Sequence, residues 1–286
     1  MLQVARLAPT LLGDSRELVS AYLYRSMNPD GGFRDRAGDS DLYYTVFGLE
    51  GLLALREPPP DVARAYLAQF GGGATLDFVH LTCLARAWAS ASPGVPPETA
   101  AAILHRIESF RALDGGYAVR QHAPHGSAYA CYLAVGAAED LSDAIPDPAG
   151  VLACLEGMRA ADGGYANHPG ASEGSTPATA ATVMVMRRLE QVPDPAMASW
   201  LLARCHPTGG FLAAPGAPLP DLLSTATALH ALSALHVECD TLREPCLDFL
   251  DSLWTSTGGF YGSWADDVLD CEYTYYGLLA LGHLSL

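Results

Sequence analysis

The sequence predicts an all-α fold in which six helical hairpins close into a ring, a closed (α/α)6 toroid. Three observations lead to this prediction. A glycine pair followed by an aromatic residue recurs along the chain, and apolar segments with helical spacing lie on both sides of each pair. Strand signals are weak throughout, because β-branched residues are diluted by Ala and Leu. We expect a single α/α-toroid domain that spans residues 1–286.

The repeat is visible as DGGF, DGGY, DGGY, TGGF and TGGF, with a degenerate copy, FGGG, between the first two. The spacings between successive copies are 41, 43, 48, 46 and 49 residues, so six units of similar length fill the chain. One glycine from each copy marks its unit: Gly31, Gly72, Gly115, Gly163, Gly209 and Gly258.

Each unit carries the start and stop signals of a helical hairpin. In the first unit, RELVSAYLYRSM precedes the glycine pair, and DLYYTVFGLEGLLAL follows a polar loop. Glycine after a helical segment is a stop signal, and Asp, Ser or Thr before an apolar run is a start signal. The same order of signals recurs in the other units, which predicts twelve helices in all.

The distribution of charge favours a closed ring over an open superhelix. The second helix of each unit is nearly free of basic residues, as in STATALHALSAL, whereas the first helices carry most of the arginines. A helix of this kind is suited to burial on most of its sides. Neither terminal unit has the polar surface of a solenoid cap. We therefore expect the second helices to form an inner layer.

Composition excludes several classes of partner and chemistry. Thirty-two acidic and sixteen basic residues give a formal charge of −16, which argues against binding to nucleic acid or to an anionic membrane surface. Every basic residue is an arginine, so lysine Schiff-base chemistry and a P-loop are excluded.

The cysteines and the apolar runs predict a soluble, cytoplasmic protein. The seven cysteines are scattered without a Cys-x-x-Cys pair, which is typical of buried thiols in a reducing compartment. Arg6 and Pro9 interrupt the first apolar run, so it is a poor signal peptide. No later apolar run approaches the roughly 18 residues that a membrane span requires.

The GG[FY] loops followed by inner helices resemble the α/α toroid shared by the β subunits of protein prenyltransferases and by squalene and terpene cyclases. The resemblance covers essentially the full chain. The final unit, GGFYGSWADDVLDCEYTYYGLLAL, is similar to the last repeat of prenyltransferase β subunits. The resemblance implies a lipophilic isoprenoid substrate in a central cavity, and the residues must then decide which chemistry the site performs.

For the prenyltransferases, the resemblance implies a zinc ion held by an Asp-x-Cys pair and a histidine. The matching positions here are Asp221, Leu223 and Tyr273, so two of the three ligands are missing. We therefore expect no cofactor. Mg²⁺ among the acidic residues near the helix starts is the open alternative, because Asp266 to Asp270 reads DDxxD, although this stretch straddles a loop and a helix start.

The basic residues with which the family binds a diphosphate, the diphosphate clamp, are also missing from their usual loop. Family members carry arginine and lysine in the loop after the penultimate glycine pair, and here that loop, FLAAPGAPLP, has no basic residue. The first unit offers Arg34 and Arg36 instead. These arginines either bind the substrate or are solvated side chains paired with Asp35 and Asp39.

The cyclases of this family protonate an alkene or epoxide with an Asp-x-Asp-Asp motif, whose clustered carboxylates keep one acid protonated. In this chain Asp39-Ser40-Asp41 is followed by Leu42, so the motif is incomplete. We predict Asp39 or Asp41 as the proton donor, with Asp270 as its partner. Helix capping is the alternative role for Asp41 and Asp270.

Aromatic residues on the inner helices are predicted to line the cavity. Tyr44 and Tyr273 each follow a capping aspartate by three residues, an offset that we expect to face the substrate. His80 has the same offset after Asp77 and is a candidate general base. Core packing is the alternative for each of these side chains. The full predicted substrate-binding set is Arg34, Arg36, Tyr44, Phe47, His80, Tyr129, Asp267, Tyr273 and Tyr276.

The functional hypothesis is an isoprenoid-processing enzyme that performs a metal-independent, acid-initiated cyclisation or isomerisation of an apolar polyprenyl substrate. Two alternatives stay open. One is a prenyl-diphosphate-using transferase whose clamp has moved to Arg34 and Arg36, and the other is a non-catalytic toroid that binds a lipid or a protein. A helical partner subunit or a homodimer is also an open prediction.

Overall fold

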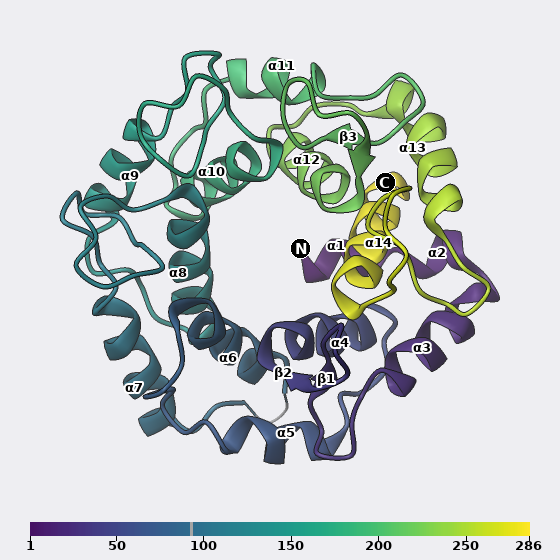
Figure 1. Ribbon diagram of the computed structural model, residues 1–286, viewed down its shortest axis with the longest axis horizontal. Helices are drawn as coiled ribbons and strands as arrows, with labels where there is room; N and C mark the ends of the chain where they lie inside the picture. The colour runs from purple at the N-terminus through teal and green to yellow at the C-terminus, as the bar shows by residue number, and fades with distance from the viewer. Residues whose placement is uncertain (92–93) are drawn as a thin grey trace.

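The helices of the chain form a closed ring of two layers, as the sequence predicts (Figure 1). The computed structural model describes residues 1–91 and 94–286. The outer layer consists of α3 (Ser15–Arg25), α5 (Asp61–Ala68), α7 (Pro97–Glu108), α9 (Pro148–Gly157), α11 (Ala196–Leu202) and α13 (Asp240–Leu253). The inner layer consists of α4 (Leu42–Ala54), α6 (Phe78–Ser90), α8 (Ala128–Asp140), α10 (Thr176–Arg188), α12 (Leu222–Ala234) and α14 (Cys271–Leu284).

Contacts between inner helices close the ring. Each inner helix packs against the next one along the chain, and α14 packs against α4. The first short helix, α1 (Leu2–Ala5), packs on α14 and α4, so the N-terminus lies inside the ring in Figure 1. The second, α2 (Pro9–Leu12), packs on α3. None of the described helices has the length and apolarity that crossing a membrane requires.

Two short antiparallel ladders occur in the loops between outer and inner helices. Strand β1 (Phe33–Arg34) pairs with β2 (Ser40–Asp41), and β3 (Phe211–Leu212) pairs with β4 (Pro220–Asp221). Both ladders place the aromatic residue of the GG[FY] motif opposite the aspartate that begins the inner helix. They therefore fix the loop against the start of the helix that follows.

Every inner helix begins at a side-chain cap, and the predicted capping role of the aspartates is confirmed. Each cap accepts a hydrogen bond from a backbone N–H in the first turn, which satisfies a donor that the helix itself leaves unpaired. Because the inner helices run parallel, these caps lie at one rim of the ring, the capped rim: Asp41, Asp77, Ser127, Ser175, Asp221 and Asp270.

The backbone N–H of each aromatic residue of the motif donates a hydrogen bond to a side chain of its inner helix, a threonine hydroxyl in four units and a cysteine thiol in one. The Phe33 N–H donates to Thr45 Oγ1 at 2.9 Å, and the Thr45 hydroxyl donates in turn to the Asp41 carbonyl. The joined residue always lies four positions after the cap. The same bond occurs between Tyr165 and Thr179, Phe211 and Thr225, and Phe260 and Thr274, while Tyr117 donates to Cys131 Sγ.

The first glycine of the motif is the joint between neighbouring hairpins. Gly258 has φ +97°, a left-handed conformation that L side chains rarely adopt, and a Cβ there would overlap the Leu18 carbonyl oxygen on α3. Gly209 meets the Pro245 carbonyl of α13 in the same way. The glycine of the sixth hairpin therefore seals the ring against the first hairpin.

We expect Gly258→Ala to destabilise the fold more than Gly163→Ala, its matched control. Gly163 has a similar φ of +89°, but no atom lies within 4 Å of its added Cβ. The control should lose about 1–2 kcal/mol of unfolding free energy through backbone strain. Gly258→Ala should lose about 1–3 kcal/mol in addition, because a backbone must move to accommodate the methyl group. Urea unfolding measures both, and equal losses would show that the joint is not tight.

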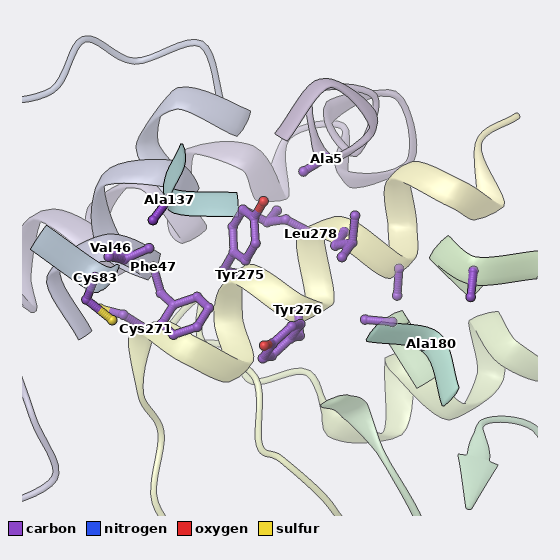
Figure 2. Close-up of a cluster of buried hydrophobic side chains, with 14 of the residues drawn as sticks. Ala5, Val46, Phe47, Cys83, Ala137, Ala180, Cys271, Tyr275, Tyr276 and Leu278 are labelled. Atoms are coloured by element: carbon purple, nitrogen blue, oxygen red, sulfur yellow. The ribbon is translucent and has the colours of Figure 1, made fainter. Parts of the chain in front are cut away.

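The core lies between the two layers, and one of its aromatic clusters lies beside α14. Tyr275 is fully buried, and its ring centroid lies 5.8 Å from that of Phe47 on α4. Tyr276 is 8% exposed, and its ring centroid lies 5.5 Å from that of the same Phe47. Figure 2 shows Phe47, Tyr275 and Tyr276 side by side. Cys271 is buried in this core, in agreement with the sequence prediction of buried thiols.

Candidate active site

The lumen of the ring contains a cavity of about 610 Å³. All six inner helices contribute to its wall, and residues 1–3 contribute as well. The half of the wall nearer the capped rim contains the aromatic side chains Tyr43, Phe47, Tyr129, Tyr132 and Tyr276, and Glu272 lies among them. A volume of this size fits a small organic ligand.

The residues that face the cavity follow a fixed offset from each cap. On five of the inner helices, the residue two positions after the cap lines the cavity. The next residues in the wall lie five or six positions after the cap. The first set is Tyr43, Tyr129, Pro177, Leu223 and Glu272. A helix advances about 100° per residue, so the offset of two and the offset of three point in clearly different directions.

The predicted offset of three residues was therefore wrong. Tyr44, His80 and Tyr273 have this offset, and none of them lies in the cavity wall. Arg34, Arg36 and Asp267 also lie outside it, in the loops at the capped rim. Of the predicted substrate-binding set, Phe47, Tyr129 and Tyr276 line the cavity, and their binding of a substrate stays a prediction.

At the capped rim, Arg36 bridges two carboxylates of the last hairpin. Its guanidinium lies 2.8 Å from Asp270 and 2.9 Å from Asp266, and it also lies over the ring of Tyr273. Burial raises the pKa of Asp270, although hydrogen bonds from the Tyr273 N–H and from Arg36 oppose the shift. The charge of Arg36 is thus already balanced by protein carboxylates.

A second ion pair at the same rim holds Asp41. His80 Nε2 lies 3.0 Å from Asp41, and His80 Nδ1 lies 2.9 Å from Asp77. The hydrogen bond to Asp41, with a further contribution from Asp77, raises the pKa of His80 to about 9 against the effect of burial. Burial alone would raise the pKa of Asp41, but the hydrogen bond and charge of His80 lower it. His80 is therefore a cation at neutral pH, unsuited to act as a base.

These contacts change the assignment of the proton donor. Asp41 is held as a carboxylate by His80, and Asp39 is an exposed loop residue outside the cavity wall. Asp270 is buried but pairs with Arg36 rather than with Asp41. The three predicted acids are thus split between a loop and two separate ion pairs, instead of crowding around one proton.

Glu272 is the carboxyl group of the cavity wall that lies nearest the capped rim. Tyr43 donates a hydrogen bond of 2.6 Å to Glu272 Oε1, and both residues lie in the cavity wall. Burial raises the pKa of Glu272 to about 7, against the opposing effects of the Tyr43 hydrogen bond and the Arg36 charge. No donor among the described residues reaches Oε2. A substantial fraction of Glu272 is therefore protonated near neutral pH, with one oxygen held by Tyr43 and no donor on the other among the described residues.

Farther from the capped rim, a buried ion pair joins Glu50 on α4 to Arg86 on α6. Arg86 donates to both oxygens of Glu50, whose side chain is only 7% exposed. The Arg86 guanidinium also lies over the rings of Phe47 and Tyr275, at 5.7 Å and 5.8 Å from their centroids. This pair fixes the orientation of Phe47, which forms part of the cavity wall.

Two histidines form the third polar feature of the cavity. His230 Nδ1 lies 3.0 Å from His283 Nε2, so one nitrogen donates and the other accepts. His230 lies in the cavity wall, and its Nε2 is buried without a hydrogen-bond partner in the described part of the chain. Burial lowers the pKa of His230 far below its usual value and that of His283 to about 4. His230 is therefore a neutral imidazole in the cavity wall whose Nε2 has no hydrogen-bond partner in the described part of the chain.

The residues at the zinc-ligand positions do not fit a zinc ion. Leu223 lies in the cavity wall with no ligand atom, and the phenol of Tyr273 has a pKa raised to about 12, chiefly by burial. Asp221 is occupied with the backbone N–H and hydroxyl of Ser224. Within residues 1–91 and 94–286, no group of three His, Cys, Asp or Glu side chains could hold a metal ion.

Sequence reasoning missed the residues with the most unusual chemistry in the cavity. Glu272 lies two residues after the predicted Asp270, and the acids around this helix start were expected to crowd at the rim rather than to face the cavity. The pattern of Tyr43, Tyr129 and Glu272 at this common offset was the available signal. His230 lies further along its helix, where its spacing allows it to face the lumen but does not indicate its pairing with His283. Nothing in the sequence context of Arg188 marks it as facing the cavity.

Comparisons with known proteins agree with this architecture. The model of the prenyltransferase alpha-alpha toroid domain matches residues 9–85, 99–211 and 178–285. No curated protein matches the sequence significantly.

Solved structures of a type II terpene cyclase, MstE from Scytonema, share the fold. The apo structure aligns over 100% of this chain and 98% of the cyclase, with a TM-score of 0.65 and 14% sequence identity. A variant of that cyclase in complex with geranylgeranyl dihydroxybenzoate, its substrate, aligns over 97% of each chain, with a TM-score of 0.64 and 15% identity.

Proposed function

The chain belongs to the prenyltransferase alpha-alpha toroid domain family, and we propose that it cyclises or isomerises a polyprenyl substrate by protonation, without a metal ion. The observation that carries the proposal is the geometry of Glu272. It is a carboxylic acid with a pKa of about 7, it faces the cavity, and Tyr43 fixes one of its oxygens. Such a group can donate a proton at neutral pH.

The first step places a proton on an alkene carbon. Glu272 transfers its proton to the distal alkene of the polyprenyl chain, and the π electrons form the new C–H bond. The neighbouring carbon becomes a tertiary carbocation, and Glu272 becomes a carboxylate. The rings of Phe47, Tyr129 and Tyr276 in the cavity wall present π faces that stabilise such a cation.

The remaining steps conserve the atoms of the substrate. In a cyclisation, the next alkene along the chain donates its π electrons to the cation, which forms a C–C bond and moves the charge onward. In an isomerisation no such bond forms. Either sequence ends when a C–H bond releases its proton to His230 Nε2 and its electrons form a new alkene. His230 suits this role because it is neutral, lies in the cavity wall and has no hydrogen-bond partner for Nε2 among the described residues.

The transferase alternative has less support. A diphosphate would have to displace Asp266 and Asp270 from Arg36, while Arg34 binds Asn28 outside the cavity. No observation in the cavity favours this chemistry over protonation.

Incubation with polyprenyl substrates tests the proposed function. Farnesyl and geranylgeranyl compounds and squalene are incubated with the protein in the presence of EDTA, and extracts are analysed by gas chromatography and mass spectrometry. We expect a product with the mass of its substrate but a different retention time. A bound but unchanged lipid would favour the non-catalytic alternative, and loss of diphosphate would favour the transferase.

We expect the rate to be highest below pH 7 and to fall about tenfold per pH unit above it. Glu272 must be protonated to act, and its raised pKa of about 7 means that the active form is lost as the pH rises through this value. Burial lowers the pKa of His230 far below its usual value, so titration of this histidine should not produce the alkaline limb. Initial rates from pH 5 to 9 measure the profile. A rate that increases with pH would contradict Glu272 as the acid.

A further inference from the structure

The first helix of the chain lies in the lumen and belongs to neither layer of the ring. Helix α1 packs on α14 and α4, and residues 1–3 form part of the cavity wall. Figure 1 shows the N-terminus inside the circle of inner helices. Because α14 already packs directly against α4, closing the ring does not require this segment. Its place in the lumen therefore needs another explanation.

The segment reaches across the lumen. Helices α14 and α8 lie on opposite sides of the ring, since three steps around the inner layer separate them in either direction. Helix α1 packs on α14, yet the hydroxyl of Tyr132 on α8 donates a hydrogen bond to Met1 Sδ at 2.9 Å. The side chain of Met1 thus contacts the aromatic wall opposite the helix on which α1 packs.

A glycine allows α1 to pack closely on α14. A Cβ at Gly282 would lie 2.2 Å from the Val4 carbonyl oxygen and 3.1 Å from the Ala5 Cα. Gly282 is the twelfth residue of α14, and the other five inner helices carry a side chain at the same position. Those residues are Leu53, Ala89, Glu139, Arg187 and Ser233. The glycine therefore occurs on the inner helix that α1 contacts at this position.

We propose that residues 1–5 limit the length of polyprenyl chain that the cavity accepts, which favours a farnesyl chain over a geranylgeranyl chain. This proposal rests on the proposed function and deepens it by naming the length of the substrate. A chain that extends from Glu272 along the lumen meets Met1 beside Tyr132. Since side chains in contact leave no room for a second molecule, the substrate must fit into the space that the segment leaves.

Hydrophobicity alone would give the opposite preference. A further isoprene unit adds apolar surface, and its burial strengthens the binding of the longer chain. A preference for the shorter chain therefore indicates a limit on space. General damage to the cavity would weaken the binding of both chains, so the ratio of their affinities reports on the segment itself.

Binding to the Glu272→Gln protein separates this proposal from catalysis. Calorimetry is performed with farnesol and geranylgeraniol, each delivered in cyclodextrin and corrected for its affinity for cyclodextrin. We expect farnesol to bind about threefold more tightly than geranylgeraniol while the segment is in place. The intact mass of the preparation verifies that Met1 is retained.

Two variants in the same background move the segment. Gly282→Ala places a methyl group against the Val4 carbonyl, and the short helix α1 can shift away more easily than α14. Deletion of residues 2–5 joins Met1 to Arg6 and withdraws it from Tyr132. Each change should reverse the ranking, so that geranylgeraniol binds about tenfold more tightly than farnesol. Circular dichroism shows whether the ring is intact, and either variant carries the test if the other fails to fold.

Gly277→Ala is the matched control on the same helix. Its Cβ would lie 2.9 Å from the ring of Phe260, so it disturbs the packing of α14 without touching α1. We expect this control to keep the preference for farnesol. Tighter binding of geranylgeraniol to the parent protein, an unchanged ranking in folded Gly282→Ala and deletion variants, or an equal reversal in Gly277→Ala overturns the length limit and leaves the proposed cyclisation standing. Failure of both alcohols to bind to any of these proteins overturns both proposals.

Discussion

We expect Glu272→Gln to lower the rate of product formation by about 10³-fold, within the range that a general acid contributes. The amide keeps the shape of the side chain and can still accept the Tyr43 hydrogen bond, but it has no acidic proton to donate. Turnover is measured as isomeric product under single-substrate conditions. Circular dichroism and thermal unfolding of the same preparation show whether the ring is intact.

Two controls separate proton donation from general damage to the site. Asp39→Asn alters an exposed loop residue outside the cavity wall and should retain the activity of the wild type. Tyr43→Phe should retain activity but shift the alkaline limb of the pH profile upward, because the Tyr43 hydrogen bond holds the pKa of Glu272 down. Activity that survives in Glu272→Gln and disappears in Asp39→Asn would falsify the assignment of Glu272.

The second large effect is on stability and concerns Glu50 and Arg86. Arg86→Met should lower the free energy of unfolding by about 3–5 kcal/mol, because it leaves the buried Glu50 carboxylate without its partner. The loss includes the contacts of the Arg86 guanidinium with the rings of Phe47 and Tyr275. Urea unfolding followed by tryptophan fluorescence measures the change.

A double variant tests the reason for this loss. Glu50→Leu combined with Arg86→Met removes both charges and should cost less than the sum of the two single changes. It also keeps the test interpretable if a single variant fails to fold, since the double variant is then expected to recover a folded protein. Strictly additive losses would show that the two side chains act independently.

The ring could be predicted from the sequence because its signals are local and repeated. Each glycine joint, each capping Asp or Ser and each apolar inner helix is encoded within one unit of about 40 to 50 residues, and six copies reinforce one another. The degenerate second copy illustrates the limit of the motif. It has Leu81 at the position where other units place the hydroxyl or thiol that binds the aromatic N–H.

The site could be predicted only in part, because its chemistry depends on contacts between distant units. The bond from Tyr43 to Glu272 joins residues 229 positions apart, and the pair of His80 and Asp41 crosses between two hairpins. An error of one residue in the facing offset was enough to select Tyr44 and Tyr273 in place of Tyr43 and Glu272. The single-domain organisation, the partner subunit and the cytoplasmic location stay predictions.

The joint at Gly258 and the contact between α14 and α4 also determine how the protein acquires its fold. An open solenoid can grow from either end and fray from either end, since each repeat depends only on its neighbours. Here Arg36 binds Asp270 across 234 positions of sequence, so the first hairpin lacks one of its two neighbours until the last hairpin is synthesised. We expect nascent chains that stop before α14 to expose the edges of both the first and the last hairpin. Closure of the ring should therefore be the late, slow and cooperative step of folding.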